Sequence, residues 1–231
     1  AENIASKQKQ ISISEFFEKN KHFLGFDTLQ RAVITAVKEA VDNSLDACEE
    51  ARILPTIKVE INKLKGDKLE LICQDNGPGI PRNSVENVFG KFLLGSRFHA
   101  IRQTRGQQGI GITGVVMYSQ LTTGSKTHVI SKIKSDSSAV HVDLGLDTRK
   151  NKATKSNEIR DVWFEDGEEV VSGLKIKTVM KAKYQRGRQS VHQYLRMTSI
   201  VNPHATIQLI VRDADGEIID QGHWIRTTEK L

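Results

Sequence analysis

Glu39-Ala40-Val41-Asp42-Asn43 lies within a stretch whose residue pattern is typical of a long amphipathic helix. Apolar and small residues recur at helical spacing from Val33 to Cys48. Asp27 is the expected N-cap, and the helix is expected to run to about Ala51. The pattern therefore predicts one buried face, with the charged residues of the stretch on the other side.

The charged side of this helix carries residue types that suit a site for water and a metal ion. Residues four apart are neighbours on a helix, so Glu39 and Asn43 project together, and Asp42 and Asp46 share one side. A glutamate can take a proton from water, and an asparagine oxygen is a hard ligand for Mg²⁺. The alternative is an ordinary solvated helix face, which the helix by itself does not exclude.

A second motif, Asp75-Asn76-Gly77-Pro78-Gly79-Ile80, follows a β-rich segment at Lys68–Cys73. The carboxylate of Asp75 at a strand end can accept a hydrogen bond from the exocyclic amine of adenine, where guanine has a carbonyl. Gly77 and Gly79 would let the backbone come close to a flat base. A plain turn is the alternative, because glycine and proline are common turn residues.

A third motif, Arg105-Gly106-Gln107-Gln108-Gly109-Ile110-Gly111, runs into a segment that is predicted to be helical from Ile110 to Gln120. Its glycines leave backbone N–H groups unobstructed, and free N–H groups at a helix N-terminus bind anions. The motif is not a Walker A loop, and a flexible surface loop is the alternative. In this order, about thirty residues apart, the three motifs describe a nucleotide pocket.

The remaining segments predict one α/β domain, with a sheet covered by helices on one face. Further strands are expected at Thr56–Asn62, His128–Lys134, Val140–Gly145, Leu174–Val179 and Ile207–Arg212, short helices within Ser84–Gln103, a helix at Val191–Ser199 and a turn at Asp215-Gly216. The polar segment Lys150–Asp161 is expected to be a loop. Residues 1–20 are expected to be an arm that packs on another element or on a second subunit.

The composition indicates a globular protein in a reducing compartment. Its 231 residues carry 34 lysines and arginines against 28 aspartates and glutamates, a net charge of +6 that is compatible with a nucleic-acid partner. The densest basic stretch is Lys181–Arg188, which could meet phosphates or be an exposed loop. Two lone cysteines, a polar start and no apolar run near about 20 residues predict a cytoplasmic location without a membrane partner.

The order of the three motifs resembles the pattern of the GHKL ATPases, in which a helical asparagine is followed by Asp-x-Gly-x-Gly and a glycine-rich lid. Longer stretches resemble the B subunits of archaeal topoisomerase VI, namely residues 38–47, 88–97, 102–111, 183–188 and 201–205. The resemblance covers nearly the whole chain. It implies a Bergerat-type two-layer α/β sandwich, with a mixed, mostly antiparallel sheet and helices on one face.

The resemblance also implies a role for each motif. Glu39 would be the general base, Asn43 would hold Mg²⁺ against the phosphates of ATP, and Asp75 would bind the adenine amine. The other nucleotide-binding residues that it implies are Asp46, Gly79, Ser96, Arg97, Arg105, Gly106, Gln107, Gln108, Gly109, Ile110, Gly111 and Ile112.

For the whole protein, the resemblance implies a machine that passes one DNA duplex through another. Residues 21–231 would be the ATPase domain, and the arm at residues 1–20 would cross to a second copy when ATP binds. The two copies would form an ATP-closed gate for double-stranded DNA, so that DNA is relaxed and decatenated. A separate A subunit would carry the DNA-cleaving tyrosine.

The chain departs from the family pattern in two ways. It lacks the helical insert and the transducer domain, which supplies a lysine to the terminal phosphate, so it is expected to be a fragment that hydrolyses ATP weakly. Ser172-Gly173-Leu174 stands where the family usually has Gly-Thr, with the hydroxyl near adenine. Leu174 cannot donate that hydrogen bond.

Two other functions remain open on the sequence. A GHKL histidine kinase would need a helix with a phospho-accepting histidine, and the seven histidines show no such context. A non-catalytic nucleotide-binding or DNA-binding GHKL module is the other alternative, and the missing transducer favours it.

Overall fold

The computed structural model describes residues 13–90, 111–147 and 152–231. The helices are α2 (Ile13–Leu24), α3 (Leu29–Glu50), the 3₁₀ helix η1 (Arg82–Ser84), α4 (Val85–Gly90), α5 (Gly111–Thr123) and α6 (Val191–Val201). The strands are β1 (Thr56–Lys63), β2 (Lys68–Asp75), β3 (Thr127–Lys132), β4 (Ala139–Asp147), β5 (Lys152–Asp161), β6 (Phe164–Glu165), β7 (Glu168–Glu169), β8 (Gly173–Lys181), β9 (Thr206–Arg212) and β10 (Ile218–Trp224).

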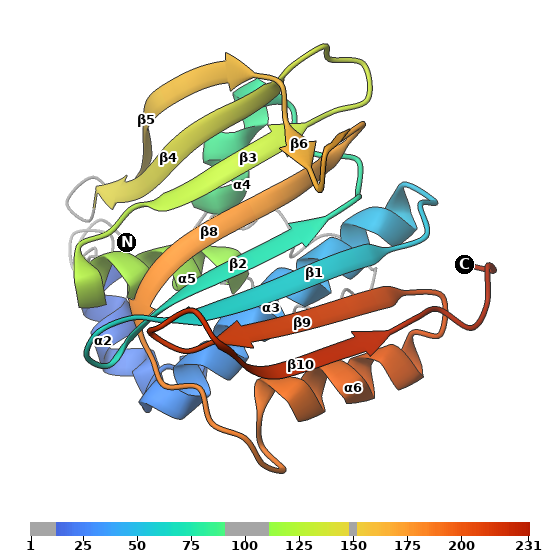
Figure 1. The fold of residues 1–231 in the computed structure, drawn as a ribbon. Coiled ribbons are helices and arrows are strands. Elements are labelled where there is room, and N and C mark those ends of the chain that lie inside the picture. The colour runs from blue at the N-terminus through green and yellow to red at the C-terminus, as the bar shows by residue number, and fades with distance from the viewer. Residues whose placement is uncertain (1–12, 91–110, 148–151) are drawn as a thin grey trace, which may run out of the picture.

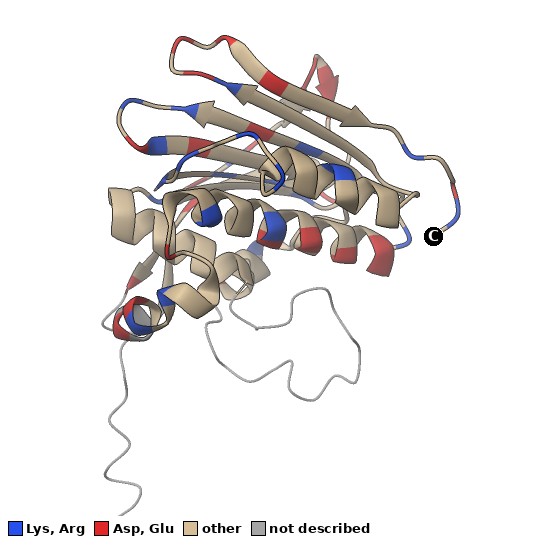
Figure 2. Cartoon of the chain, turned by 90° about the horizontal axis from the view of Figure 1, so that it is seen from below, with Lys and Arg blue, Asp and Glu red and all other residues tan. Residues whose placement is uncertain are grey.

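Eight of these strands form one sheet in the order β10-β9-β1-β2-β8-β3-β4-β5, and β6 and β7 form a separate small hairpin. Only β1 and β9 pair in parallel, while the other pairs in the large sheet are antiparallel. Figures 1 and 2 show α3, α5 and α6 on the same face of the sheet. The expected two-layer architecture with a mostly antiparallel sheet is therefore confirmed.

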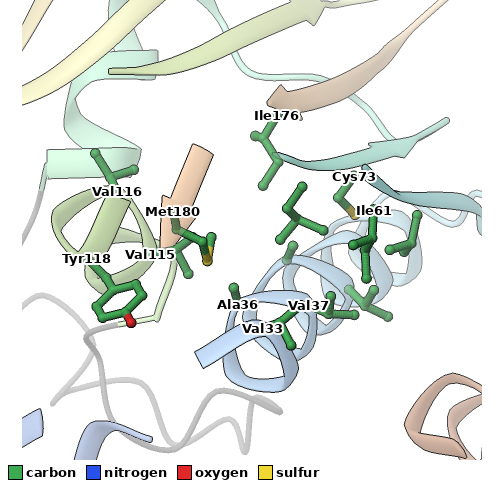
Figure 3. Packing of buried hydrophobic residues seen from close by; sticks show 14 of the residues in the cluster. Val33, Ala36, Val37, Ile61, Cys73, Val115, Val116, Tyr118, Ile176 and Met180 are labelled. Carbon is green, nitrogen blue, oxygen red and sulfur yellow. The ribbon is translucent and has the colours of Figure 1, made fainter. Parts of the chain in front are cut away.

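The core lies between this sheet face and the helices. Successive side chains of a strand point to opposite faces, and β1 buries Ile57, Val59 and Ile61 while the residues between them are partly exposed. In Figure 3, Val33 and Val37 of α3 point into the same apolar layer as Ile61. The predicted apolar face of the helix is thus the surface that packs against the sheet.

The start of α3 differs from the expectation. The N-cap is Thr28, whose hydroxyl accepts a hydrogen bond from the backbone N–H of Arg31, and not Asp27. Asp27 instead pairs with the guanidinium of Arg31 at 2.7 Å and with His22 at 2.9 Å. Both Asp27 and Thr28 are good capping residues, so local sequence could not separate them.

The expected loop at Lys150–Asp161 is wrong, because Lys152–Asp161 forms strand β5. This strand lies at the edge of the sheet and pairs only with β4. Ala153 is buried, whereas Thr154 and Lys155 are exposed. An edge strand is held by backbone hydrogen bonds and commonly carries charged side chains, which is why the apolar pattern did not reveal it.

Helix α2 contains part of the segment that the sequence assigned to an arm. Phe17 is fully buried, with its ring centroid 5.5 Å from that of Phe26 and 6.2 Å from that of Tyr118. Helix α2 therefore packs on the core of the same chain through Phe17, and the arm boundary expected after residue 20 falls inside α2. Across the described ranges, none of the helices combines the length and apolar character needed to cross a membrane.

Candidate functional site

The middle of α3 presents its polar side chains in half-buried positions. Glu39, Asp42, Asn43 and Asp46 are all partly covered, so they do not form the solvated face that the helix pattern left open. Neighbouring elements cover them, because α3 packs against α5 on one flank and α6 on the other. Glu39 lies beside Gly111 of α5, and Asp42 accepts a hydrogen bond from Tyr194 of α6, so these two side chains are restrained by tertiary contacts.

Glu39 lies against the first residue of α5. A Cβ atom added to Gly111 would stand 3.2 Å from Glu39 Oε2, which is closer than most side-chain contacts. Gly111 also has φ of 34°, a backbone conformation that glycine adopts without steric cost. Glu39 of the first motif and Gly111 of the third motif are 72 positions apart in the sequence. The fold thus brings these two motifs together at this point.

The environment of Glu39 changes its acidity. Burial raises the pKa of the Glu39 carboxyl above its usual value, and the negative charge of Asp42 raises it further, while Lys38 acts in the opposite direction. A carboxylate with a raised pKa is a stronger proton acceptor. Glu39 is therefore a stronger proton acceptor than an exposed glutamate.

Asp75 sits at the end of β2 in a cradle of three donors. The Ser44 hydroxyl donates to Oδ2 at 2.6 Å, while the backbone N–H groups of Gly77 and Leu174 donate to Oδ1 at 2.9 and 3.2 Å. The residue is 5% exposed, and burial raises the pKa of its carboxyl although all three donors act the other way. The carboxylate is held in one orientation, with lone pairs left on Oδ2 for a further donor.

The glycines around Asp75 serve close backbone packing. A Cβ on Gly79, which has φ of 72°, would overlap the carbonyl oxygen of Lys132 on β3. A Cβ on Gly173 would overlap the carbonyl oxygen of Asp75. These contacts within the chain require glycine whether or not a flat base approaches.

The departure at Leu174 has a structural counterpart. The side chain of Leu174 offers no hydrogen bond, but its backbone N–H reaches Asp75. Thr178, on the same strand, is buried and hydrogen-bonded to Thr127 at 3.0 Å. The Thr178 hydroxyl is therefore already engaged with Thr127 inside the core.

Several predicted nucleotide-binding residues fall outside the described ranges: Ser96, Arg97, Arg105, Gly106, Gln107, Gln108, Gly109 and Ile110. Ile112 is half-buried and packs on the core. In the described part of the chain, no three His, Cys, Asp or Glu side chains are grouped as metal ligands. The described part of the site is thus the Glu39 turn, the Asp75 cradle and the start of α5.

Sequence reasoning missed three contributors. Ser44 lies on the buried face of α3, among the small and apolar residues that define the helical pattern, and a hydroxyl at such a position is the signal that it has a polar partner. The N–H of Leu174 could not be found, since it comes from a residue 99 positions from Asp75. Tyr194 on α6 donates its hydroxyl to Asp42 Oδ1 at 3.0 Å across 152 positions, which is equally invisible to local patterns.

The basic stretch at Lys181–Arg188 connects β8 to α6 and is anchored by Asp220 of β10. Asp220 is 6% exposed and accepts hydrogen bonds from Tyr184 at 2.5 Å and Arg186 at 3.2 Å. The side chains of Lys181, Lys183, Arg186 and Arg188 are exposed. The stretch is therefore a fixed loop that presents positive charge to solvent.

Comparison with known families and proteins gives a consistent result. The family model described as "Histidine kinase-, DNA gyrase B-, and HSP90-like ATPase" matches residues 28–149, which contain all three motifs. The chain is 49% identical over 233 residues to the B subunit of the type 2 DNA topoisomerase 6 of Methanosarcina acetivorans, and the match covers 100% of this chain and 36% of the relative.

A second relative and a solved structure agree with this match. The protein of the same name from Archaeoglobus fulgidus is 50% identical over 216 residues, covering 93% of this chain and 35% of the relative. The chain therefore spans little more than a third of the length of these relatives. The crystal structure of the N-terminal domain of a DNA repair protein has a TM-score of 0.56 at 18% identity, covering 92% of this chain and 56% of that one, which shows a shared fold.

Proposed function

The chain belongs to the histidine kinase-, DNA gyrase B- and HSP90-like ATPase family, and we propose that it is the ATP-binding and ATP-hydrolysing domain of an archaeal topoisomerase VI B subunit. The identity of about half of all positions with two such subunits supports this assignment. Membership of the family implies nucleotide binding. We further propose that the nucleotide is ATP, that the metal ion is Mg²⁺ and that the whole protein is a topoisomerase.

The observation that carries the proposal is the preorganised carboxylate of Asp75. Three donors from α3, the turn after β2 and the start of β8 hold it, so its remaining lone pairs are directed without further ordering. A fixed acceptor binds an amine with little loss of conformational freedom. In the proposal, Asp75 accepts the exocyclic amine of adenine, while Gly79, Asp46, Ile112 and the glycine-rich segment contact the rest of the nucleotide.

The polar turn of α3 supports the hydrolytic part of the proposal. Glu39 is half-buried with a raised pKa and lies against Gly111, the last residue of the glycine-rich motif and the first residue of α5. Asn43, one turn further along, offers the single hard oxygen that a Mg²⁺ ion bound mainly by water and phosphates requires. When bound there, Mg²⁺ would neutralise phosphate charge, and Glu39 would take the proton from the attacking water.

Binding of a non-hydrolysable ATP analogue in the presence of Mg²⁺ tests the proposal directly. We expect saturable binding by calorimetry, with a dissociation constant below about 1 mM, the upper end of common KM values. The GTP analogue should bind more weakly, because guanine presents a carbonyl to Asp75. No heat of binding at millimolar ATP analogue would contradict the assignment.

The alternative is a module that binds nucleotide without hydrolysing it. The resemblance implies that a transducer lysine contacts the terminal phosphate, and a cation on developing phosphate charge is a large catalytic contribution, so residues 21–231 alone are expected to hydrolyse ATP slowly at most. Release of inorganic phosphate from ATP separates the two functions. Slow but Mg²⁺-dependent release supports hydrolysis, whereas binding without release supports the alternative.

The proposed partners are a second copy of the B subunit, the DNA-cleaving A subunit and double-stranded DNA. The names of the relatives place those proteins in a topoisomerase with other subunits. In the proposal, the part of the 1–20 arm that precedes α2 crosses to the second copy when ATP binds, since Phe17 of α2 packs in the core of its own chain. Sedimentation with and without the ATP analogue tests this exchange.

We expect the exposed cations of Lys181, Lys183, Arg186 and Arg188 to contact DNA phosphates. Contacts to phosphates release counterions, so the affinity for duplex DNA should fall steeply as salt rises. Replacing Lys183 and Arg188 by glutamine should reduce the slope of log affinity against log salt by about two, roughly one for each phosphate contact. An unchanged slope would assign the loop to a role other than DNA contact.

A further inference from the structure

Ser131, near the end of β3, is tied to the segment that follows β2. The backbone N–H of Ile80 donates to Ser131 Oγ at 2.7 Å, and the same hydroxyl donates to the carbonyl oxygen of Ile80 at 2.9 Å. Ser131 is 2% exposed, and 51 positions separate it from Ile80. One buried hydroxyl therefore pairs with both backbone groups of a single residue, as a residue of a neighbouring strand would do.

This tie spans β8, which lies between β2 and β3 in the sheet (Figure 1). Residues 76–80, here called the crossing turn, therefore pass over the start of β8 to reach β3. A Cβ on Gly79 would overlap the carbonyl oxygen of Lys132 and would stand 3.2 Å from that of Gly173. The backbone of the crossing turn thus lies directly against the end of β3 and the start of β8.

The two ends of the crossing turn are linked through one strand pair. At its start, Asp75 accepts a hydrogen bond from the backbone N–H of Leu174 at 3.2 Å. At its end, Ile80 is bonded to Ser131, and Ser131 is the partner of Leu174 in the pairing of β3 with β8. Ser131 therefore closes a ring of contacts that begins and ends at Asp75.

The two halves of the crossing turn have different supports. In the first half, the side chain of Asn76 accepts a hydrogen bond from the backbone N–H of Thr56 at 2.7 Å and donates to the carbonyl oxygen of Leu54 at 3.1 Å. These hydrogen bonds fasten the first half to the entry of β1. The second half reaches β3, where Ser131 binds it. Loss of the Ser131 hydroxyl should therefore release the second half and leave the first half in place.

We propose that Ser131 is a positioning residue for nucleotide recognition, which holds the second half of the crossing turn where the base packs on Gly79 and its amine meets Asp75. This inference rests on the proposed ATP-binding function and assigns a further residue to it. The Ser131 hydroxyl is engaged by Ile80, so it acts on the base through the turn. Its loss should weaken nucleotide binding and leave the chemical step intact, because Glu39 lies against α5.

Ser131→Ala removes only the hydroxyl, and it is assayed for nucleotide affinity and for turnover. We expect the dissociation constant of the non-hydrolysable ATP analogue to rise about tenfold, because a turn that is no longer preorganised must be ordered on binding. At saturating ATP, kcat should stay within about twofold of the unmodified protein, so that the loss appears in KM. Ser131→Cys provides a weak donor and acceptor and should raise the dissociation constant by a smaller factor, about threefold.

A double-mutant cycle with Asp75→Asn shows whether the loss acts on recognition of the base. Where the contact between Asp75 and the amine is already lost, adding Ser131→Ala should weaken analogue binding by less than about a further threefold, because two residues that serve one contact are not additive. A further loss of about tenfold in the Asp75→Asn background would show that Ser131 supports the fold in general, and it would overturn the inference.

Ser119→Ala is the matched control. Ser119 is another fully buried serine, and its hydroxyl donates to the carbonyl oxygen of Val179 on β8 at 2.7 Å. This variant should lower the thermal stability by a similar amount to Ser131→Ala, since both lose buried hydrogen bonds to the backbone. The dissociation constant of the analogue should stay within about twofold of the unmodified protein. Equal weakening of binding by the two variants would show that the inference is wrong.

The outcomes separate this inference from the proposed function. If the unmodified protein binds the ATP analogue and neither Ser131→Ala nor Ser131→Cys changes its dissociation constant, the inference is wrong while the proposed function stands. If Ser131→Ala lowers kcat at saturating ATP as much as it weakens binding, Ser131 has a general structural role and the inference is again wrong. If Ser131→Ala does not fold, Ser131→Cys decides between these results. If the unmodified protein does not bind the analogue, both the proposed function and the inference are wrong.

Discussion

Replacement of Glu39 by alanine is expected to reduce ATP turnover by about 10²–10⁴-fold, the usual contribution of a general base. Glu39 is the half-buried carboxylate that lies against the start of α5, and burial and the charge of Asp42 raise its pKa. The substitution removes a proton acceptor without removing a contact to the base. The affinity for the non-hydrolysable ATP analogue should therefore change by less than about threefold.

Phosphate release under single-turnover conditions and calorimetric binding of the analogue measure the two effects separately. Glu39→Gln should behave like Glu39→Ala, because the amide keeps the shape but cannot take a proton. Glu50→Ala is the matched control, since Glu50 is an exposed glutamate at the end of the same helix. Parallel loss of turnover and binding in Glu39→Ala would instead assign Glu39 a structural role.

Replacement of Asp75 by asparagine is expected to weaken ATP binding by about 10–150-fold, which corresponds to the roughly 1.5–3 kcal/mol of a hydrogen bond to a charged group. The amide oxygen can take the place of Oδ1 and keep the N–H groups of Gly77 and Leu174 paired. The NH₂ group then replaces Oδ2 and can donate to the rotatable hydroxyl of Ser44. The framework survives, but a donor now faces the amine of adenine.

Discrimination between ATP and GTP analogues is the second readout of Asp75→Asn. The amide NH₂ can donate to the carbonyl of guanine, so the preference for ATP should shrink or reverse. Glu70→Gln is the control on the same strand, because Glu70 lies on the outer face and pairs with Lys177 at 2.9 Å. Unchanged ATP affinity in Asp75→Asn, with thermal stability preserved, would exclude Asp75 as the base-reading residue.

Asp75→Ala is expected to behave differently from Asp75→Asn. It would leave the hydroxyl of Ser44 and two backbone N–H groups buried without an acceptor, each costing about 1–3 kcal/mol. A loss of this size approaches the whole stability of many domains. For this reason asparagine, and not alanine, is the informative substitution.

The helices and central strands could be predicted because their apolar residues follow local periods. The buried positions of α3 recur at helical spacing, and apolar residues alternate in β1 and β2. The predicted ends of these three elements therefore lie within one or two residues of the observed ends. Edge strand β5 could not be predicted, since its side chains are mostly polar and show no apolar alternation, and its pairing with β4 depends on backbone groups. Strand β10 at the opposite edge follows the predicted turn at Asp215-Gly216 and was not predicted either, because its buried Asp220 breaks the apolar alternation and is paired with Tyr184 and Arg186, which lie far away along the chain.

The sequence by itself determined the helix that carries Glu39 and Asn43, the strand that ends at Asp75 and the order of the three motifs along the chain. These features depend on residue type and spacing over a few turns or strand residues. The tertiary structure alone decided that Glu39 meets Gly111, that Ser44 and Leu174 hold Asp75, and that Tyr194 holds Asp42. Those contacts join segments 31 to 152 positions apart, which only the packing of α3 against the sheet, α5 and α6 brings together.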